Sequence, residues 1–272
     1  MDRSLRFSFG KNWESFVNKA LTPERINDAV DSLSNFFGAN DLENQTFLDI
    51  GCGSGLFSLA ARKLGARVHS FDLDPLSVAC ATELKKRYFP GDGAWTIAQG
   101  NVLDMDYASS LGQFDLVYAW GVLHHTGAMW EALENVVSTV AKGGKLYISI
   151  YNDQGSASRR WALLKKFHNQ SSKPIKMSIL LMIAVLWLIH SSLVRLMLFQ
   201  NPLPFREWAE KKKNRGMSVW HDLVDWVGGY PFEVAKPEEI FHFYQKKGFE
   251  LMKLQTCGGR SGCNEYVFIR RQ

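Results

Sequence analysis

The run Phe47-Leu-Asp-Ile-Gly-Cys-Gly-Ser-Gly55 joins a short apolar segment to a glycine-rich loop. Its apolar residues predict a buried strand over Thr46–Ile50, and helical spacing of apolar residues begins directly after Gly55. The order of strand, turn and helix repeats at Arg67–Asp72 and Pro75–Tyr88. Units that alternate in this way predict a mostly parallel sheet with helices on both faces.

The same pattern extends along most of the chain. Further strands are predicted at Trp95–Gln99, Phe114–Trp120, 145–151, 251–255 and 265–270, the last two as an antiparallel pair. The expected fold class is therefore α/β, with a doubly wound, seven-stranded, mostly parallel Rossmann-like sheet. We expect a helical N-terminal cap at residues 1–44, a sheet domain at 45–151 and 237–272, and a large helical insert after the fifth strand at 152–236.

Composition excludes several protein classes. With 46% hydrophobic and 22% charged residues in 272, the chain is typical of a globular protein rather than a disordered one. Its four cysteines show neither metal-ligand spacing nor a disulfide framework. Residues 1–6 lack the apolar core of a signal peptide, so we expect a cytoplasmic protein.

The insert is both the most basic and the most apolar part of the sequence. Residues 151–216 hold twelve Lys/Arg against three Asp/Glu, and residues 177–194 carry no formal charge. About 18 apolar residues can cross a bilayer, but one crossing would separate strands of a single sheet. We therefore expect a helix that lies on an anionic membrane surface, at the inner face, with its basic flanks attracted to the lipid.

Other uses of the insert remain open at this point. The apolar helix could instead be a lid buried against the catalytic domain, or an element that forms a homodimer. Nucleic acid is not an expected partner, because RNA binding favours aromatic side chains among the basic residues over a continuous aliphatic run.

The glycine-rich loop predicts a nucleoside-type ligand at the carboxyl ends of the strands. A dinucleotide-binding fingerprint requires a third glycine where Leu56 stands, so the loop does not predict a dinucleotide cofactor. Asp49 would repel a pyrophosphate but suits an ammonium group, and Asp72 ends the second strand, where a carboxylate can bind ribose hydroxyls. S-adenosylmethionine, which carries an ammonium, a sulfonium and no phosphate, is the predicted cofactor.

Five motifs in order resemble those of the class I S-adenosylmethionine-dependent methyltransferases. They are FLDIGCGSG at 47–55, SFDLDP at 70–75, QGNV at 99–102, FDLVYAWGVLHH at 114–125 and GGKL at 143–146. The position of the insert is similar to that in the ubiquinone-pathway O-methyltransferases, which carry a basic, apolar membrane-contacting element there and methylate phenols bearing a prenyl tail.

The resemblance implies an assignment of the cofactor site. The methionine end would lie on the loop, the ribose on Asp72, and the adenine between Leu73 and the turn at Asn101 and Val102. Asn101 departs from the aspartate that is usual in the family. The expected cofactor-binding residues are Asp49, Gly51, Cys52, Gly53, Gly55, Asp72, Leu73, Asn101, Val102 and Trp120, with Trp13 beside Phe16 as a cap over the pocket.

Candidate catalytic residues follow from the need to orient a nucleophile and to remove its proton. His125, after the fourth strand, and His221 with Asp222, in the tail of the insert, are the expected base and substrate contacts. Together the three could bind a divalent ion that acidifies a phenol, but no spacing among them demands one, and no residue is assigned as a metal ligand. For His124 a structural role in packing the loop is preferred.

The sequence thus predicts an enzyme that methylates a hydrophobic small molecule, at oxygen, at a membrane surface. The alternatives are a methyltransferase of a soluble sugar or metabolite, with the insert as a lid or dimer element, and a non-catalytic scaffold that binds the cofactor.

Overall fold

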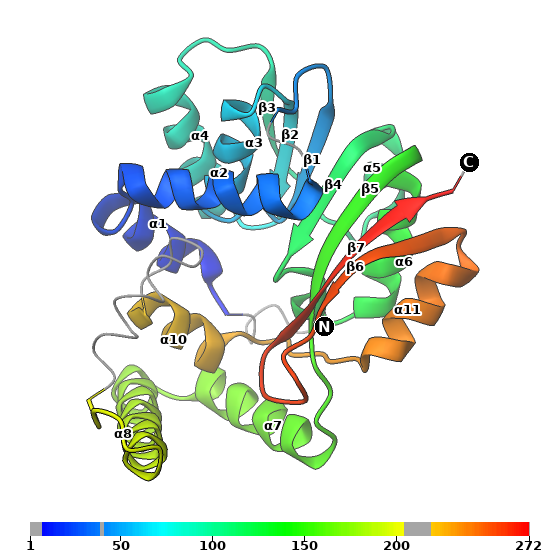
Figure 1. The fold of residues 1–272 in the computed structure, drawn as a ribbon. Helices are drawn as coiled ribbons and strands as arrows, with labels where there is room; N and C mark the ends of the chain where they lie inside the picture. The colour runs from blue at the N-terminus through cyan, green and yellow to red at the C-terminus, as the bar shows by residue number, and fades with distance from the viewer. Residues whose placement is uncertain (1–6, 39–40, 204–218, 272) are drawn as a thin grey trace.

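A computed structural model describes residues 7–38, 41–203 and 219–271, and shows one seven-stranded sheet (Figure 1). The strand order is β3-β2-β1-β4-β5-β7-β6, and only β7 runs antiparallel to its neighbours. This arrangement confirms the predicted fold class. The strands are β1 (Thr46–Ile50), β2 (Arg67–Asp72), β3 (Trp95–Gln99), β4 (Phe114–Trp120), β5 (Val140–Tyr151), β6 (Phe249–Gln255) and β7 (Cys263–Arg270).

Helices cover both faces of the sheet and form a separate apolar core on each. One core lies under α1 (Phe9–Lys19), α2 (Pro23–Phe37), α3 (Leu56–Lys63) and α4 (Pro75–Tyr88). The other lies under α5 (Met105–Ser110), α6 (Met129–Thr139) and α11 (Pro237–Lys246). Because strand order reverses between β1 and β4, the carboxyl ends of these two strands border the crevice where ligands bind in such sheets.

Local signals explain where the helices near this crevice begin. Helix α4 starts at Pro75, and the side chain of Asp74 accepts a hydrogen bond from the backbone N–H of Leu76. Helix α2 starts at Pro23 after a Thr22 cap and ends at Gly38, which has a φ of 67°. Both signals are visible in the sequence.

Several elements differ from the sequence-based expectation; β6 and β7, for example, each begin two residues earlier. Strand β5 begins at Val140, which pairs with Phe114, rather than at residue 145. The helical spacing of Trp130, Leu133 and Val137 predicts that Trp130 faces the core, but helix α6 buries Met129 and leaves the Trp130 side chain exposed. The short helix α5 was not predicted, because six residues are too few to show a helical repeat.

The described part of the insert contains α7 (Ser156–Gln170), α8 (Lys173–Met197) and α10 (Val219–Gly228), which contact one another beside the sheet domain (Figure 1). Three α8 residues, Ile179, Leu180 and Ile183, pack against α10. Helix α8 is long and apolar enough to cross a membrane, because it contains an 18-residue stretch with a mean hydropathy of 2.2. Only 17% of that stretch is buried in the protein. Most of its apolar surface therefore has no protein cover in the described chain.

Candidate functional site

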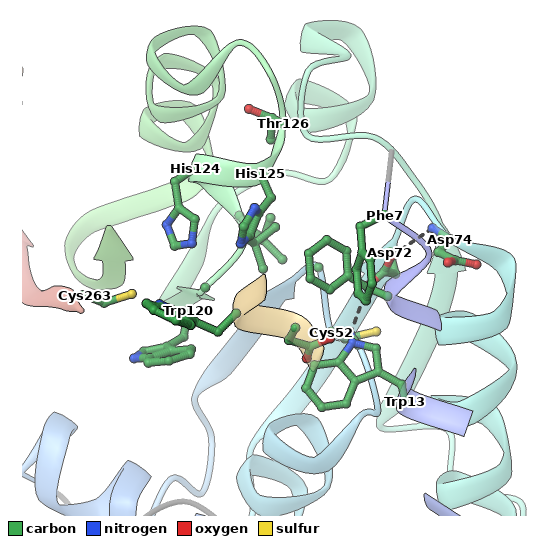
Figure 2. Close-up of a pocket in the computed structure, with 18 of the residues that line it drawn as sticks. Phe7, Trp13, Cys52, Asp72, Asp74, Trp120, His124, His125, Thr126 and Cys263 are labelled. Atoms are coloured by element: carbon green, nitrogen blue, oxygen red, sulfur yellow. Dashed lines mark hydrogen bonds between the residues drawn. The ribbon is translucent and has the colours of Figure 1, made fainter. Parts of the chain in front are cut away.

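A cavity of about 1660 Å³ opens at the carboxyl ends of the central strands and extends to the insert (Figure 2). Ligand pockets for one small molecule measure about 300–1,000 Å³. The volume is therefore large enough for a nucleoside-type cofactor and a second molecule. Among the described residues that line it are five carboxylates and no lysine or arginine; the carboxylates are Asp49, Asp72, Asp74, Asp225 and Glu265.

The glycine-rich loop forms one wall of this cavity. Backbone N–H groups of Gly51 and Cys52 donate to the carbonyl of Phe71 at 2.8 and 3.0 Å, which fixes the loop on β2. Gly53 has a φ of 53°, and a Cβ there would lie 2.8 Å from Nε1 of Trp13. Gly55 has a φ of 80°, and its Cβ would meet the α4 backbone at 2.7 Å. Glycine is therefore required at both positions.

Asp49 lies beneath the loop and is almost completely buried. The hydroxyl of Ser58 donates to its carboxylate, Ser58 contacts the hydroxyl of Ser70 at 2.7 Å, and Nε1 of Trp95 donates to Ser70 at 2.9 Å. Burial raises the pKa of Asp49 to about 7, against the opposing effect of the Ser58 hydrogen bond, and the charge of Asp72 raises it further. A cation bound in the loop would stabilise the ionised carboxylate.

Asp72 ends β2 beside the loop. Its Oδ2 accepts a hydrogen bond from Gly53 N–H at 3.0 Å, and its Oδ1 accepts one from Asp74 N–H at 2.8 Å. Asp74 in turn accepts from the backbone N–H of Gly10 at 3.0 Å, so its carboxylate holds the start of α1. This contact brings Trp13 of α1 over the loop (Figure 2). Phe16, expected beside it, is buried in the core instead.

The turn after β3 borders the same end of the cavity. Leu73, Asn101 and Val102 all line it. The side-chain oxygen of Asn101 accepts from the backbone N–H of Leu103 at 3.1 Å, and Nε2 of Gln99 donates to the Leu73 carbonyl at 3.1 Å. The structure thus brings the three residues of the predicted adenine site together.

These residues fit S-adenosylmethionine. The buried carboxylate of Asp49 suits an ammonium, Asp72 offers a carboxylate at the cavity wall, and the acidic lining of the described cavity disfavours a pyrophosphate.

The cavity lining also includes a carboxylate that the sequence did not reveal, Glu265. Trp120 ends β4 and donates from Nε1 to Oε1 of Glu265 at 3.1 Å, and Glu265 also accepts from the Tyr147 hydroxyl at 2.7 Å. Glu265 pairs with Ser149 across the β5–β7 ladder. Its place at the cavity depends on that pairing, for which the sequence around Glu265 has no signal.

His125 lies on a short 3-10 turn, Leu123–His125, at the cavity wall. Its Nδ1 lies 2.6 Å from the carbonyl of Pro231. Because a carbonyl only accepts, Nδ1 carries the proton, and in a neutral imidazole the acceptor nitrogen is then Nε2. Pro231 was not a predicted site residue. Neither was Gly229, two residues before it, whose added Cβ would lie 2.8 Å from the His125 ring.

The structure does not place the side chains of the other two predicted catalytic residues relative to His125. His221 and Asp222 fall in the first turn of α10, but their side chains lie outside the described residues. No group of His, Cys, Asp and Glu suited to a metal ion occurs in the part of the chain that was described.

Comparison with known proteins identifies the family to which the chain belongs. Residues 22–179, more than half of the chain, match the family described as "Methyltransferase domain". A tRNA U34 carboxymethyltransferase from Methylococcus capsulatus is 31% identical over 43% of this chain and 36% of its own length. A ribosomal protein L11 methyltransferase from the same organism is 30% identical over 41% and 35%. The chain therefore spans about a third of the length of these curated relatives.

Solved structures share the fold over nearly the whole chain. Magnesium protoporphyrin IX methyltransferase from Synechocystis PCC 6803, with bound SAH, has a TM-score of 0.56 at 15% identity, over 96% of this chain and 93% of that one. The N-methyltransferase NodS from Bradyrhizobium japonicum, in complex with S-adenosyl-l-homocysteine, has a TM-score of 0.54 at 16% identity, over 97% and 100%. With the family match, the fold and a loop that fits S-adenosylmethionine, the predicted enzyme class is confirmed: the chain belongs to the methyltransferase-domain family of S-adenosylmethionine-dependent enzymes.

Proposed function

We propose that this protein transfers a methyl group from S-adenosylmethionine to an oxygen atom of a lipophilic small molecule, at the cytoplasmic surface of an anionic membrane. One observation carries the proposal: the cavity that contains the glycine-rich loop continues to α8, where Ile183, Leu186, Trp187 and His190 line it. A single cavity thus joins the cofactor site to the most apolar exposed helix of the described chain.

The residues at the loop bind and shield the methyl donor in this proposal. The cofactor supplies a methyl group already activated by its sulfonium. Asp49 pairs with the ammonium, Asp72 binds the ribose, and Trp13 covers the loop and excludes water. His125 takes the proton of the acceptor hydroxyl at Nε2, because the Pro231 carbonyl holds its Nδ1–H.

The surface of the insert supports contact with a membrane. Both ends of α8 connect to strands of one sheet, and β5 pairs directly with β7, so a single crossing of a bilayer would break that sheet. Basic residues lie on α7 and α8 beside the exposed apolar side chains, and each adds about 1 kcal/mol of attraction to anionic lipid near its surface. These residues are Arg159, Arg160, Lys166, Lys173, Lys176 and Arg195.

The acidic cavity argues against an RNA acceptor, although one relative is named for tRNA. A phosphate backbone is bound through lysine and arginine, and neither lines the described cavity.

Methyl-labelled S-adenosylmethionine, incubated with the protein and an extract of the source cells, tests the proposal. We expect label in the organic phase, where mass spectrometry would identify the acceptor, and no transfer by an Asp72→Ala variant. Label confined to the aqueous phase would contradict a lipophilic acceptor and favour a soluble metabolite, with α8 as a lid or dimer element.

A further inference from the structure

Glu265 is a carboxylate of the cavity wall whose hydrogen-bond partners are both neutral. Its Oε1 accepts a hydrogen bond from Nε1 of Trp120 at 3.1 Å, and its Oε2 accepts one from the Tyr147 hydroxyl at 2.7 Å. None of the ion pairs among the described residues includes Glu265. An ionised carboxylate has about four acceptor sites, so each oxygen can still accept a hydrogen bond from a ligand.

The sheet holds this carboxylate in place. Glu265 pairs with Ser149 of β5, which pairs with Trp120 of β4, so the three side chains project from the same face of the sheet. Tyr147, two residues before Ser149, lies on that face too, and its ring stacks on Phe36 with centroids 4.1 Å apart. A carboxylate fixed in this way loses little conformational freedom when a ligand binds.

The cofactor does not account for Glu265. S-adenosylmethionine carries a single net positive charge, and two other carboxylates, Asp49 and Asp72, already lie at the loop and at the end of β2. Figure 2 shows Trp120, a hydrogen-bond partner of Glu265, well apart from Trp13, which covers the loop. A cation that meets Glu265 is therefore expected on the second molecule that the cavity can hold.

Aromatic rings in the cavity lining favour the same kind of ligand, because their faces attract cations. The lining includes Trp120, Tyr151, Trp161 and Trp226. Two of these rings already contact an amine of the protein itself, since Nζ of Lys165 lies 5.6 Å from the ring centroid of Tyr151 and 6.0 Å from that of Trp226. A carboxylate among such rings favours a cationic ligand over a neutral or anionic one.

We infer that Glu265 binds a positively charged nitrogen of the methyl acceptor, either a protonated amine or a quaternary ammonium. The acceptor is then a lipophilic compound that carries a cationic group. Such a nitrogen has no lone pair with which to attack the methyl group, so it serves for recognition, and the hydroxyl at His125 remains the nucleophile. This inference rests on the proposed function, since it assigns a substrate class to the same cavity.

Calorimetric titration with three probes of equal tail length tests the inference. At pH 7.5 octylamine is a cation, octanol is neutral and octanoate is an anion. With S-adenosylhomocysteine present, we expect octylamine to bind about tenfold more tightly than octanol, the effect of one charge-assisted hydrogen bond, and octanoate to bind most weakly. Glu265→Gln, which keeps the size of the side chain and removes its charge, should bind octylamine and octanol equally. Glu265→Asp should keep part of the preference.

Two other carboxylates supply matched controls. Asp225 also lines the cavity but accepts a hydrogen bond from Asn12, and Glu238 is exposed on α11, outside the cavity lining. Asp225→Asn and Glu238→Gln should both keep the preference for octylamine. A preference that survives in Glu265→Gln, or that is absent from the unmodified protein, would overturn the inference and leave the proposed function standing.

A last comparison separates the acceptor from the cofactor. We expect Glu265→Gln to bind S-adenosylmethionine and S-adenosylhomocysteine as the unmodified protein does, which also shows that the variant is folded. If the variant binds only S-adenosylmethionine more weakly, Glu265 pairs with the sulfonium and the inference is wrong. If no probe binds to the unmodified protein while S-adenosylhomocysteine does, the lipophilic acceptor itself is refuted.

Discussion

Asp49 couples cofactor binding to pH. Its folded-state pKa of about 7 means that the carboxylate is largely protonated at pH 5.5, whereas an ammonium ligand binds best to the ionised form. We expect the dissociation constant of S-adenosylmethionine to rise as pH falls from 7.5 to 5.5, by up to about tenfold per pH unit below the pKa. Isothermal titration across this range measures the effect.

Two variants isolate the carboxylate responsible. Asp49→Asn should bind the cofactor weakly and with little dependence on pH, because no proton has to leave. Asp225→Asn, which alters a carboxylate near the insert, should retain the pH dependence of the unmodified protein. An affinity that stays constant in the unmodified protein would show that Asp49 does not pair with the ammonium.

Among the elements, those with a strong local signal were predictable. Strand β1 and helix α4 have the predicted bounds, because an apolar run before glycines and an Asp-Pro start are local features. The start of β5 was not predicted, since Val140 is held by pairing with β4 rather than by its own neighbours in sequence. The same distinction holds for the residues of the candidate site. The loop residues form a sequence motif, whereas Glu265 and Pro231 are more than 100 residues along the chain from the residues they contact, Trp120 and His125.

Helix α8 is the element that should bind lipid. Leu181, Val185 and Ile189 follow one another at helical spacing, and each is about half exposed. Replacing all three with glutamine should weaken binding to anionic vesicles about a hundredfold, because each loses on the order of 1 kcal/mol of apolar burial in the membrane. Vesicle sedimentation in low salt measures this loss.

The control replaces the same number of exposed apolar residues elsewhere. Met105, Met252 and Leu254 lie on α5 and β6, away from the insert, and are similarly exposed. Their replacement with glutamine should leave sedimentation unchanged. If the unmodified protein does not sediment with vesicles, α8 is not a membrane element, and a lid or a second protein copy becomes the better account.

At the scale of the whole molecule, α10 connects the other two helices of the insert, α7 and α8, to the cap over the cofactor loop. Nζ of Lys165, on α7, donates to the carbonyl of Trp226, and the amide of Asn169 donates to Gly228 at 2.6 Å. On the other side, Asn12 of α1 donates to Asp225 at 2.8 Å. Helix α10 therefore contacts α7 and α8 on one side and α1, the helix that carries Trp13, on the other.

Lys165 makes this junction sensitive to pH. Burial lowers its pKa from 10.5 to about 7, and the charge of Asp225 only partly opposes that shift. Between pH 7 and pH 10.5, the Lys165 amine is protonated in the unfolded chain but has lost its proton in the folded protein. Lys165 therefore makes the free energy of unfolding rise with pH. From pH 7 to 9.5 the gain should be about 2–3 kcal/mol, as the difference between the protein and its Lys165→Met variant in urea unfolding. The control is Lys166→Met, which changes an exposed neighbour and should show the full rise in the free energy of unfolding with pH. An equal rise in Lys165→Met would mean that the buried amine is not the group that titrates.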